Sequence, residues 1–204
     1  MALITDYATL DTAVDDYLAR SDLSTFVPNF IQNCESKLYK SLRIRTMETV
    51  LSGTIASGVL AVPSDYLELK YAYVNVAPTR WLERVPPERI YRDHATRSGA
   101  SYPRMIAREA TNFIFGPYPG AHAIAGIYYA RLTVLDASSN TTNWFTTNAP
   151  DLLLYGSLLE AEPFLKNDAR LPLWKSMYDW AFKNVQDEEM RENKSGGSVR
   201  TRVA

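Results

Sequence analysis

Cysteine and histidine are scarce in this sequence, and their scarcity limits the chemistry that it can support. Its 204 residues include one cysteine, Cys34, and two histidines, His94 and His122. A lone cysteine cannot form an internal disulfide, so the fold is not stabilised by disulfides and the protein can fold in a reducing compartment. These three residues lie far apart and lack the i, i+3 or i+4 spacing of metal ligands. No acidic loop has calcium-binding spacing. We therefore expect no metal site.

Long hydrophobic runs and phosphate-binding glycine motifs are also missing. The apolar run Ala123–Ala130 is among the longest, and it falls short of the roughly 18 residues that a membrane helix needs. The first twenty residues carry four aspartates and one arginine, the wrong sign for a signal peptide. No G-x-G-x-x-G or G-x-x-x-x-G-K motif is present, and Gly156-Ser157 stands outside a G-x-S-x-G motif. The sequence predicts a soluble intracellular protein with no membrane partner and no cofactor.

Net charge is small as well. With 22 basic and 23 acidic residues the formal charge is −1, and 46% of the residues are hydrophobic. Such a chain can bury a substantial core, but it is not suited to bind nucleic acid by bulk electrostatics. Aromatic residues next to arginine, as in Tyr128-Tyr129-Ala130-Arg131, could stack on a nucleic-acid strand. A DNA-binding module therefore stays open as a less favoured alternative.

The basic residues that are present are unevenly distributed. Arginine supplies 15 of the 22, and no lysine occurs between Lys70 and Lys166. Seven arginines against three acidic residues give the segment from Arg80 to Arg108 a net charge of +4. Arginine is enriched where protein surfaces meet, because its planar fork binds carboxylates bidentately. Two interpretations stay open: a solvated face with local ion pairs, or a protein interface. The residues that we nominate for an interface are Arg80, Arg84, Arg89 and Arg92.

Helical spacing of apolar residues marks both ends of the chain. Residues 5–47 read as two helices. Residues 152–165 are apolar in almost every direction, which predicts a central buried helix that Pro163 kinks or stops. A final amphipathic helix begins near residue 171 and ends in a charged run at residues 186–194.

Between these helices the apolar period changes to two. A hairpin is predicted through Ala56-Ser57-Gly58. A following strand is predicted with one face in the core, made by Leu67, Leu69, Tyr71 and Tyr73. A short helix is expected at Pro87–His94, and the last strand at Ala123–Leu132.

These segments together predict an α+β fold. N- and C-terminal helix pairs form a four-helix bundle, and an antiparallel β module is inserted between them. The helical domain is expected to cover residues 1–48 and 143–194, and the β domain residues 49–142. Ser195-Gly196-Gly197-Ser198 should release a flexible C-terminal tail, residues 195–204.

The only carboxylate pair that suggests catalysis is Glu160 with Glu162. A glycosidase needs two carboxylates facing each other across a cleft, whereas residues two apart on a helix point to different sides. We therefore predict no catalytic residues. A tail-associated peptidoglycan hydrolase stays open as the enzymatic alternative.

In sequence order, several segments resemble the head-to-tail adaptor proteins of tailed bacteriophages, also called tail accessory or head-completion proteins. The resemblance spans nearly the whole chain and is closest to adaptors of short-tailed phages. The segments that carry it are Tyr17-Leu18-Ala19-Arg20-Ser21-Asp22-Leu23, Leu42-Arg43-Ile44-Arg45-Thr46-Met47-Glu48-Thr49, Val62-Pro63-Ser64-Asp65-Tyr66-Leu67-Glu68-Leu69, residues 82–90, Phe113-Ile114-Phe115-Gly116-Pro117, Tyr128-Tyr129-Ala130-Arg131, Thr142-Asn143-Trp144-Phe145 and residues 149–161.

The resemblance implies a structural virion protein, made in the host cytoplasm and placed at the head–tail junction. Such adaptors form a ring, typically twelve-fold, between the portal protein and the tail nozzle or tail hub. The ring extends the channel for packaged DNA, which passes without specific binding. In the family the C-terminal segment docks on the portal, and the residues here that would take this role are Arg200, Thr201, Arg202 and Val203.

Overall fold

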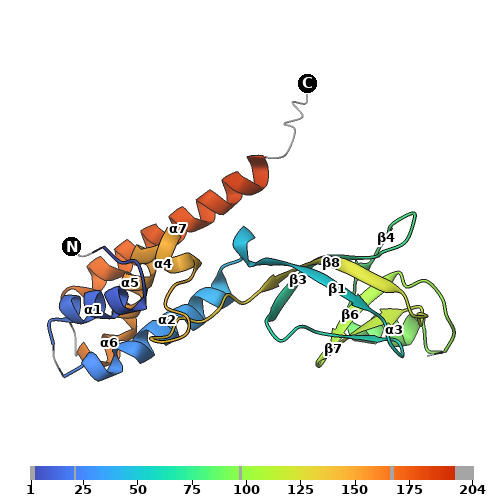
Figure 1. Cartoon of the computed structure of the whole chain (residues 1–204), viewed down its shortest axis with the longest axis horizontal. Coiled ribbons are helices and arrows are strands. Elements are labelled where there is room, and N and C mark those ends of the chain that lie inside the picture. The colour runs from blue at the N-terminus through green and yellow to red at the C-terminus, as the bar shows by residue number, and fades with distance from the viewer. Residues whose placement is uncertain (1–2, 21, 97, 166–167, 196–204) are drawn as a thin grey trace, which may run out of the picture. The chain divides into compact units, whose positions relative to one another are not determined.

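The computed structural model describes residues 3–20, 22–96, 98–165 and 168–195 (Figure 1). The chain is a mixed α+β protein that divides into two compact units. The helical unit contains the described residues of Met1–Thr46 and Leu132–Ala204, and the β unit contains those of Met47–Arg131. The β unit is thus inserted, in sequence, between the two halves of the helical unit.

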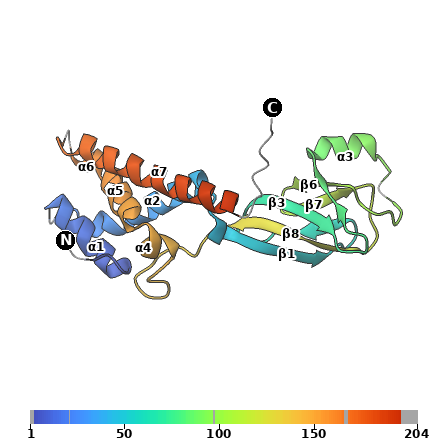
Figure 2. The same cartoon turned by 90° about the horizontal axis from the view of Figure 1, so that it is seen from above.

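Helix α5 (Pro150–Glu160) is the centre of the helical unit. It packs against α1 (Tyr7–Leu18), α2 (Val27–Ser41), α4 (Trp144–Asn148) and α7 (Leu171–Ser195), which surround it in Figure 2. Its fully buried leucines point in several directions: Leu152, Leu153, Leu154 and Leu158. The predicted central buried helix is therefore confirmed.

Short helical segments complete this unit. A turn of 3-10 helix lies at Ser24–Phe26, and another, at Arg45–Met47, spans the point in the chain where the β unit begins. Helix α5 ends at Glu160, and α6 (Glu162–Leu165) begins one residue later. The predicted interruption near Pro163 is present, because proline is tolerated in the first turn of a new helix but not inside an existing one.

Helix α4 was not predicted, and its N-cap explains why it forms. The side chain of Asn143 accepts hydrogen bonds from the backbone N–H groups of Phe145 and Thr146, and Thr146 Oγ1 in turn accepts from the Asn143 N–H. This capping box satisfies backbone donors that a helix start leaves open. It outweighs the weak helix propensity of a segment rich in tryptophan, phenylalanine and threonine.

The chain that leads from the β unit to α4 is fastened to α2 by one buried carboxylate, that of Glu35. It accepts hydrogen bonds from the Leu135 N–H at 3.2 Å, from Asn143 Nδ2 at 2.7 Å and from the Tyr39 hydroxyl at 3.2 Å. Burial raises the pKa of Glu35, because removal from water disfavours the charged form. Glu35 therefore ties residues on both sides of this connection to α2.

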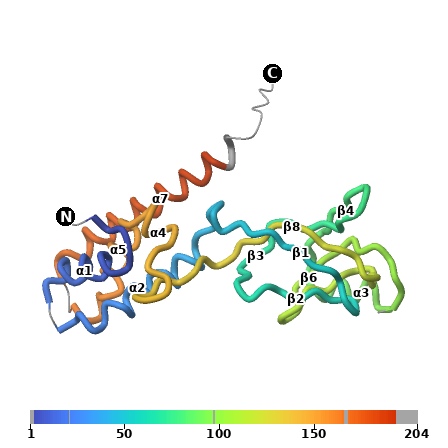
Figure 3. Tube along the Cα trace, in the orientation of Figure 1, coloured from blue at the N-terminus to red at the C-terminus, as the bar shows by residue number. Residues whose placement is uncertain are grey.

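The strands of the β unit form two sheets in the described part of the chain. The first sheet is antiparallel, and its strands follow the order β1 (Glu48–Thr54), β8 (Ala123–Ala130), β3 (Tyr66–Val74) and β4 (Arg80–Trp81). The second sheet has the order β2 (Val59–Ala61), β7 (Asn112–Gly116), β6 (Met105–Glu109) and β5 (Glu83–Arg84), with β5 parallel to β6. Figure 3 traces both sheets along the Cα path.

The core of the β unit is built from both sheets. Leu51 and Ile124 of the first sheet belong to one buried cluster with Phe113 and Phe115 of the second. Helix α3 (Pro87–Asp93) adds Ile90 to a second cluster that also contains residues of β6 and β7. The predicted short helix is present at this position.

The predicted core face of the third strand is wrong in its second half. Leu69 is buried, as expected, but Tyr71 is exposed and Tyr73 is half-buried, whereas Ala72 and Val74 are buried. The pairing of β3 with β8 shifts between Leu69 and Tyr71, where a β-bulge places one extra residue in β3. A bulge reverses the alternation of faces beyond it, so a strict period of two assigns Tyr71 and Tyr73 to the wrong side.

The predicted hairpin is also only partly correct. The turn exists, since Ala56 and Val59 exchange backbone hydrogen bonds of 2.9 and 3.1 Å. The strands on its two sides then separate, because β1 pairs with β8 in the first sheet and β2 pairs with β7 in the second. The turn therefore joins two sheets instead of closing a two-stranded ribbon.

Candidate interaction surfaces

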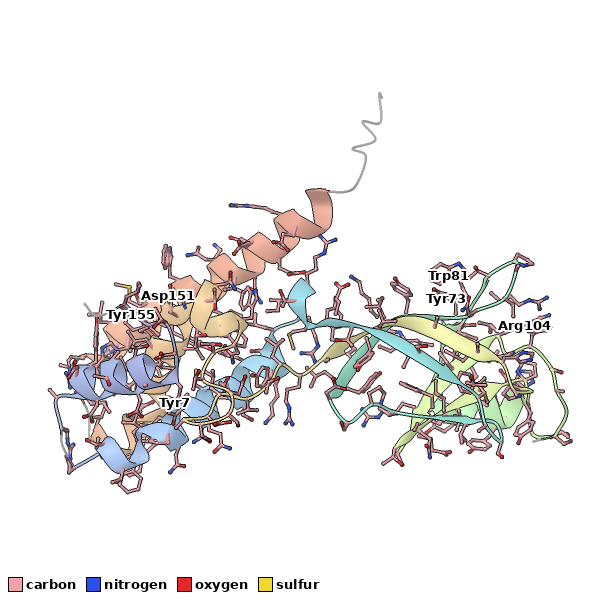
Figure 4. All side chains as sticks on the ribbon, viewed as in Figure 1. Tyr7, Tyr73, Trp81, Arg104, Asp151 and Tyr155 are labelled. Carbon is pink, nitrogen blue, oxygen red and sulfur yellow. The ribbon has the colours of Figure 1, made fainter. Side chains whose placement is uncertain are left out.

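The bulge in β3 exposes a group of aromatic and apolar side chains on the outer face of the first sheet. Tyr71 and Tyr73 each contact Trp81 with ring centroids 5.5 Å apart, and they stack on each other at 6.5 Å. Trp81 is 65% exposed and Val50, on β1, is 67% exposed. Figure 4 shows Tyr73 and Trp81 together at the β3–β4 edge. We call Val50, Tyr71, Tyr73 and Trp81 the aromatic face.

A second apolar surface lies on α7. One side of this helix is packed against α5 and buries Trp174, Ala181 and Val185. Leu173, Met177 and Trp180 follow the i, i+4, i+7 spacing of a different side, and all three are exposed, Trp180 by 62%. We call these three residues the α7 stripe. The sequence indicates the α7 stripe through these three apolar residues, which have helical spacing but do not belong to the buried side of the helix.

The four arginines nominated from the sequence lie in the β unit on three elements. Arg80 is on β4, Arg84 on β5, and Arg89 and Arg92 are on α3. The structure therefore does not gather all of them on one element, although they remain close in the chain.

Three of these arginines have acidic partners within the β unit. Arg89 lies 2.8 Å from Glu83 and 3.4 Å from Asp93, and its pKa is raised by these contacts. Arg92, with 76% of its side chain exposed, lies 3.2 Å from Asp93. Exposed pairs of this kind contribute little to stability, so they can be exchanged for contacts to another protein at little cost.

Arg84 has a structural role that the sequence did not indicate. Its Nη1 donates a hydrogen bond to the Leu69 carbonyl at the β-bulge, and the same atom lies 3.8 Å from Glu68. Arg84 on the second sheet thus supports the distorted strand of the first sheet. Arg80 instead places its guanidinium over the Tyr102 ring, 4.2 Å from the centroid.

The carboxylates Glu160 and Glu162 line one cavity of about 230 Å³ in the helical unit. Our expectation that they point to different sides assumed one continuous helix, and the chain instead changes helix between them. Glu160 is already paired with Lys37 at 2.5 Å. Cys34 and Tyr178 also line this cavity. Burial raises the pKa of each to about 12, which keeps both groups protonated at neutral pH.

Other candidate chemistry is limited in the described part of the chain. No group of three or more histidine, cysteine, aspartate or glutamate residues that could hold a metal ion is found there. His122 stacks on Tyr102 with ring centroids 4.3 Å apart, a packing contact. The predicted tail residues Arg200, Thr201, Arg202 and Val203 lie outside the described residues.

Comparison with known families identifies the family of proteins to which this chain belongs. The family model described as SU10 adaptor protein matches residues 5–202, which is nearly the whole chain. The chain belongs to the SU10 adaptor protein family. The predicted membership in a phage head-to-tail adaptor family is thereby confirmed. No curated protein sequence matches the adaptor.

Membership assigns a setting to the exposed surfaces of the adaptor. Phage adaptors interact with portal and tail components, and their place is the head–tail junction of the virion. The family is structural. Among the described helices of this adaptor, none combines the length and the apolarity that crossing a bilayer requires. The aromatic face, the α7 stripe and the arginines of the β unit are therefore candidate contacts within the virion.

Proposed function

We propose that the protein forms an adaptor ring that joins the portal vertex to the tail nozzle, extends the DNA channel and completes the head after packaging. The observation that carries this proposal is the family match over residues 5–202. We propose twelve copies per ring and a short-tailed virion, as the sequence resemblance implies. A closed ring requires each copy to present two different surfaces to its two neighbours.

The proposed architecture is a four-helix bundle with an inserted β domain. The bundle consists of the N-terminal pair α1 and α2 and the C-terminal pair α5 and α7. The central place of α5, which packs against the other three, supports this assignment. The shorter helices α4 and α6 are additions at the ends of α5.

The proposed contacts of the ring use charged residues. Arg80, Arg84, Arg89 and Arg92 are assigned to a neighbouring subunit or to the nozzle, and residues 200–203 to the portal. The low cost of exchanging exposed ion pairs supports the role of Arg89 and Arg92. A formal net charge of −1 supports a channel wall that does not bind the passing DNA.

Binding to purified portal protein tests the proposal. We expect the full chain to bind the portal in several copies, and a variant lacking residues 196–204 to bind at least about tenfold more weakly, because a tail that wraps a partner contributes much of such an interface. A full chain that does not bind portal would contradict the proposed function. Undiminished binding of the shortened variant would remove only the role of the tail.

The arginine contacts need a separate variant, because Arg84 supports the fold of the β unit. Arg92→Glu reverses an exposed charge with little expected effect on stability, and Lys175→Glu in the helical unit, whose exposed side chain is paired with Asp179 four residues on, is its matched control. We expect Arg92→Glu to weaken ring assembly or nozzle attachment and Lys175→Glu to leave both unchanged. Equal behaviour of the two variants would contradict the assignment.

A structural role also predicts no turnover of peptidoglycan. Wild-type protein and a Glu160→Gln, Glu162→Gln variant should both release no soluble muropeptides from purified cell walls. Release by the wild type that the double variant loses would favour the hydrolase instead.

A further inference from the structure

The aromatic face and the α7 stripe are two exposed apolar surfaces on different units of the same chain. Soluble monomers rarely expose large contiguous apolar patches, and such patches mark interaction sites. Tryptophan and tyrosine are the side chains that most often anchor protein interfaces. Trp81 and Trp180, exposed by 65% and 62%, are the largest side chains of the two surfaces.

From this we infer that in the assembled adaptor the aromatic face of one copy packs against the α7 stripe of the next copy. The inference rests on the proposed ring, and it names the surfaces that join neighbouring subunits. A ring closes through heterologous contacts, in which one surface meets a different surface on the next copy. The chain offers one such surface in each unit.

Charge complementarity favours a second copy of this chain as the partner. Residues 47–131 contain nine basic and seven acidic residues, so the β unit carries +2 and the rest of the chain carries −3. Opposite net charges of the two units favour contact between unlike units of neighbouring copies over contact between like units.

The shapes of the two surfaces also suit each other. The aromatic face spans the four strands of the first sheet, because Val50 on β1 and Tyr71 on β3 both stand opposite Ile127 of β8, and Tyr73 pairs with Trp81 of β4. Neighbouring strands lie about 4.8 Å apart, so the face is about 14 Å wide, and a helix about 10–12 Å in diameter covers most of it. The α7 stripe is straight and two turns long, which matches the packing of one helix on one sheet.

Crosslinking between introduced cysteines tests this contact in the assembled state. Tyr71→Cys and Met177→Cys are combined in one chain, which is then bound to portal-bearing heads and treated with a short bis-maleimide. Both positions are exposed, so the substitutions should leave the fold intact, which thermal unfolding checks. Native Cys34 can stay in place, because it is buried and its pKa is raised to about 12, which leaves little reactive thiolate.

The double variant is expected to give a ladder of crosslinked dimers, trimers and higher species. Each single variant alone should give none, because it carries only one half of the contact. The matched control combines Tyr71→Cys with Gln186→Cys, since Gln186 is exposed on α7 half a turn away from the direction of Met177. Adding Trp180→Asp to the double variant should lower the crosslinked fraction at least about tenfold.

Three results would overturn the inference. The first is dimers from Tyr71→Cys alone or from Met177→Cys alone, which would show that identical surfaces meet. The second is a crosslinked ladder that the Gln186→Cys control reproduces. The third is a double variant that crosslinks only within single chains or not at all. These results are separable from a failure of the proposed function. If wild-type protein does not bind the heads in several copies, the ring itself is refuted, whereas bound protein without the ladder refutes only this contact.

Discussion

At the scale of single residues, Glu35 illustrates how one side chain can organise a connection. It lies on α2, is buried, and accepts hydrogen bonds from Leu135 and Asn143 on the segment that leads into α4 and from Tyr39 on its own helix. Glu35 shares a helix face with the buried residues Ile31, Leu38 and Tyr39, but its charge gives no reason to expect burial. Its role follows from which segment crosses α2, and that is a property of the fold.

Replacing this carboxylate should change how stability depends on pH. Because the pKa of Glu35 is raised, the native state holds a proton that the unfolded state has already lost above about pH 4.3. The stability contributed by Glu35 is therefore present at low pH and falls as the pH rises through the raised pKa. Glu35→Gln places an amide N–H₂ among three donors and should cost about 1–3 kcal/mol near pH 4.

Urea unfolding of both proteins between about pH 4 and pH 8 measures this effect. The difference in unfolding free energy between wild type and Glu35→Gln should shrink as the pH rises. A difference that stays constant or grows would show that burial does not disfavour the charged carboxylate.

Gly126 on β8 is required by a close approach of two strands. A Cβ atom at this position would lie 2.3 Å from the Tyr71 carbonyl oxygen and 2.8 Å from Ala72 Cα, both backbone atoms that cannot move aside. Gly126→Ala should therefore destabilise the protein by about 1–3 kcal/mol in thermal or urea unfolding.

Gly53 on β1 is the matched control for this substitution. Its added Cβ would meet only the end of the flexible Leu60 side chain, at 2.6 Å. Gly53→Ala should cost clearly less than Gly126→Ala. Equal costs would mean that a close backbone approach at β8 is not the cause.

At the scale of elements, α7 has two apolar sides with different purposes. Its buried side was predictable from the spacing of Trp174, Ala181 and Val185. The exposed α7 stripe has the same helical spacing, but the spacing does not show that this second apolar side lacks a partner within the chain. In strand β3 the exposed side could not be predicted, because the bulge after Leu69 depends on pairing with β8 and has no recognisable pattern in a single sequence.

Two tryptophans on α7 should therefore respond differently to truncation. Trp174 is buried against the helical unit and lies under the guanidinium of Arg170, 4.8 Å from its ring centroid. Trp174→Ala should cost about 3–5 kcal/mol in urea unfolding. Trp180→Ala removes an exposed ring and should stay within about 0.5 kcal/mol of wild type, while weakening assembly. Similar losses of stability in both variants would contradict the exposure of the α7 stripe.

At the scale of the whole molecule, the small net charge hides a division between the units. The β unit is positive and the rest of the chain is negative. The α+β class, the central helix and the insertion of strands between helices were all readable from periodicity, because each depends on local apolar spacing. The exposed surfaces could not be predicted in this way, because they depend on the bulge in β3, on the turn that places β1 and β2 in different sheets, and on which side of α7 packs against α5.

The central claim is that this chain is the ring that connects the portal to the tail. Cryo-electron microscopy of the mature virion tests it most directly. We expect density for the helical and β units of this chain in a closed ring directly below the portal, coaxial with the DNA channel. A head–tail junction without this chain, or with the chain elsewhere in the particle, would contradict the account.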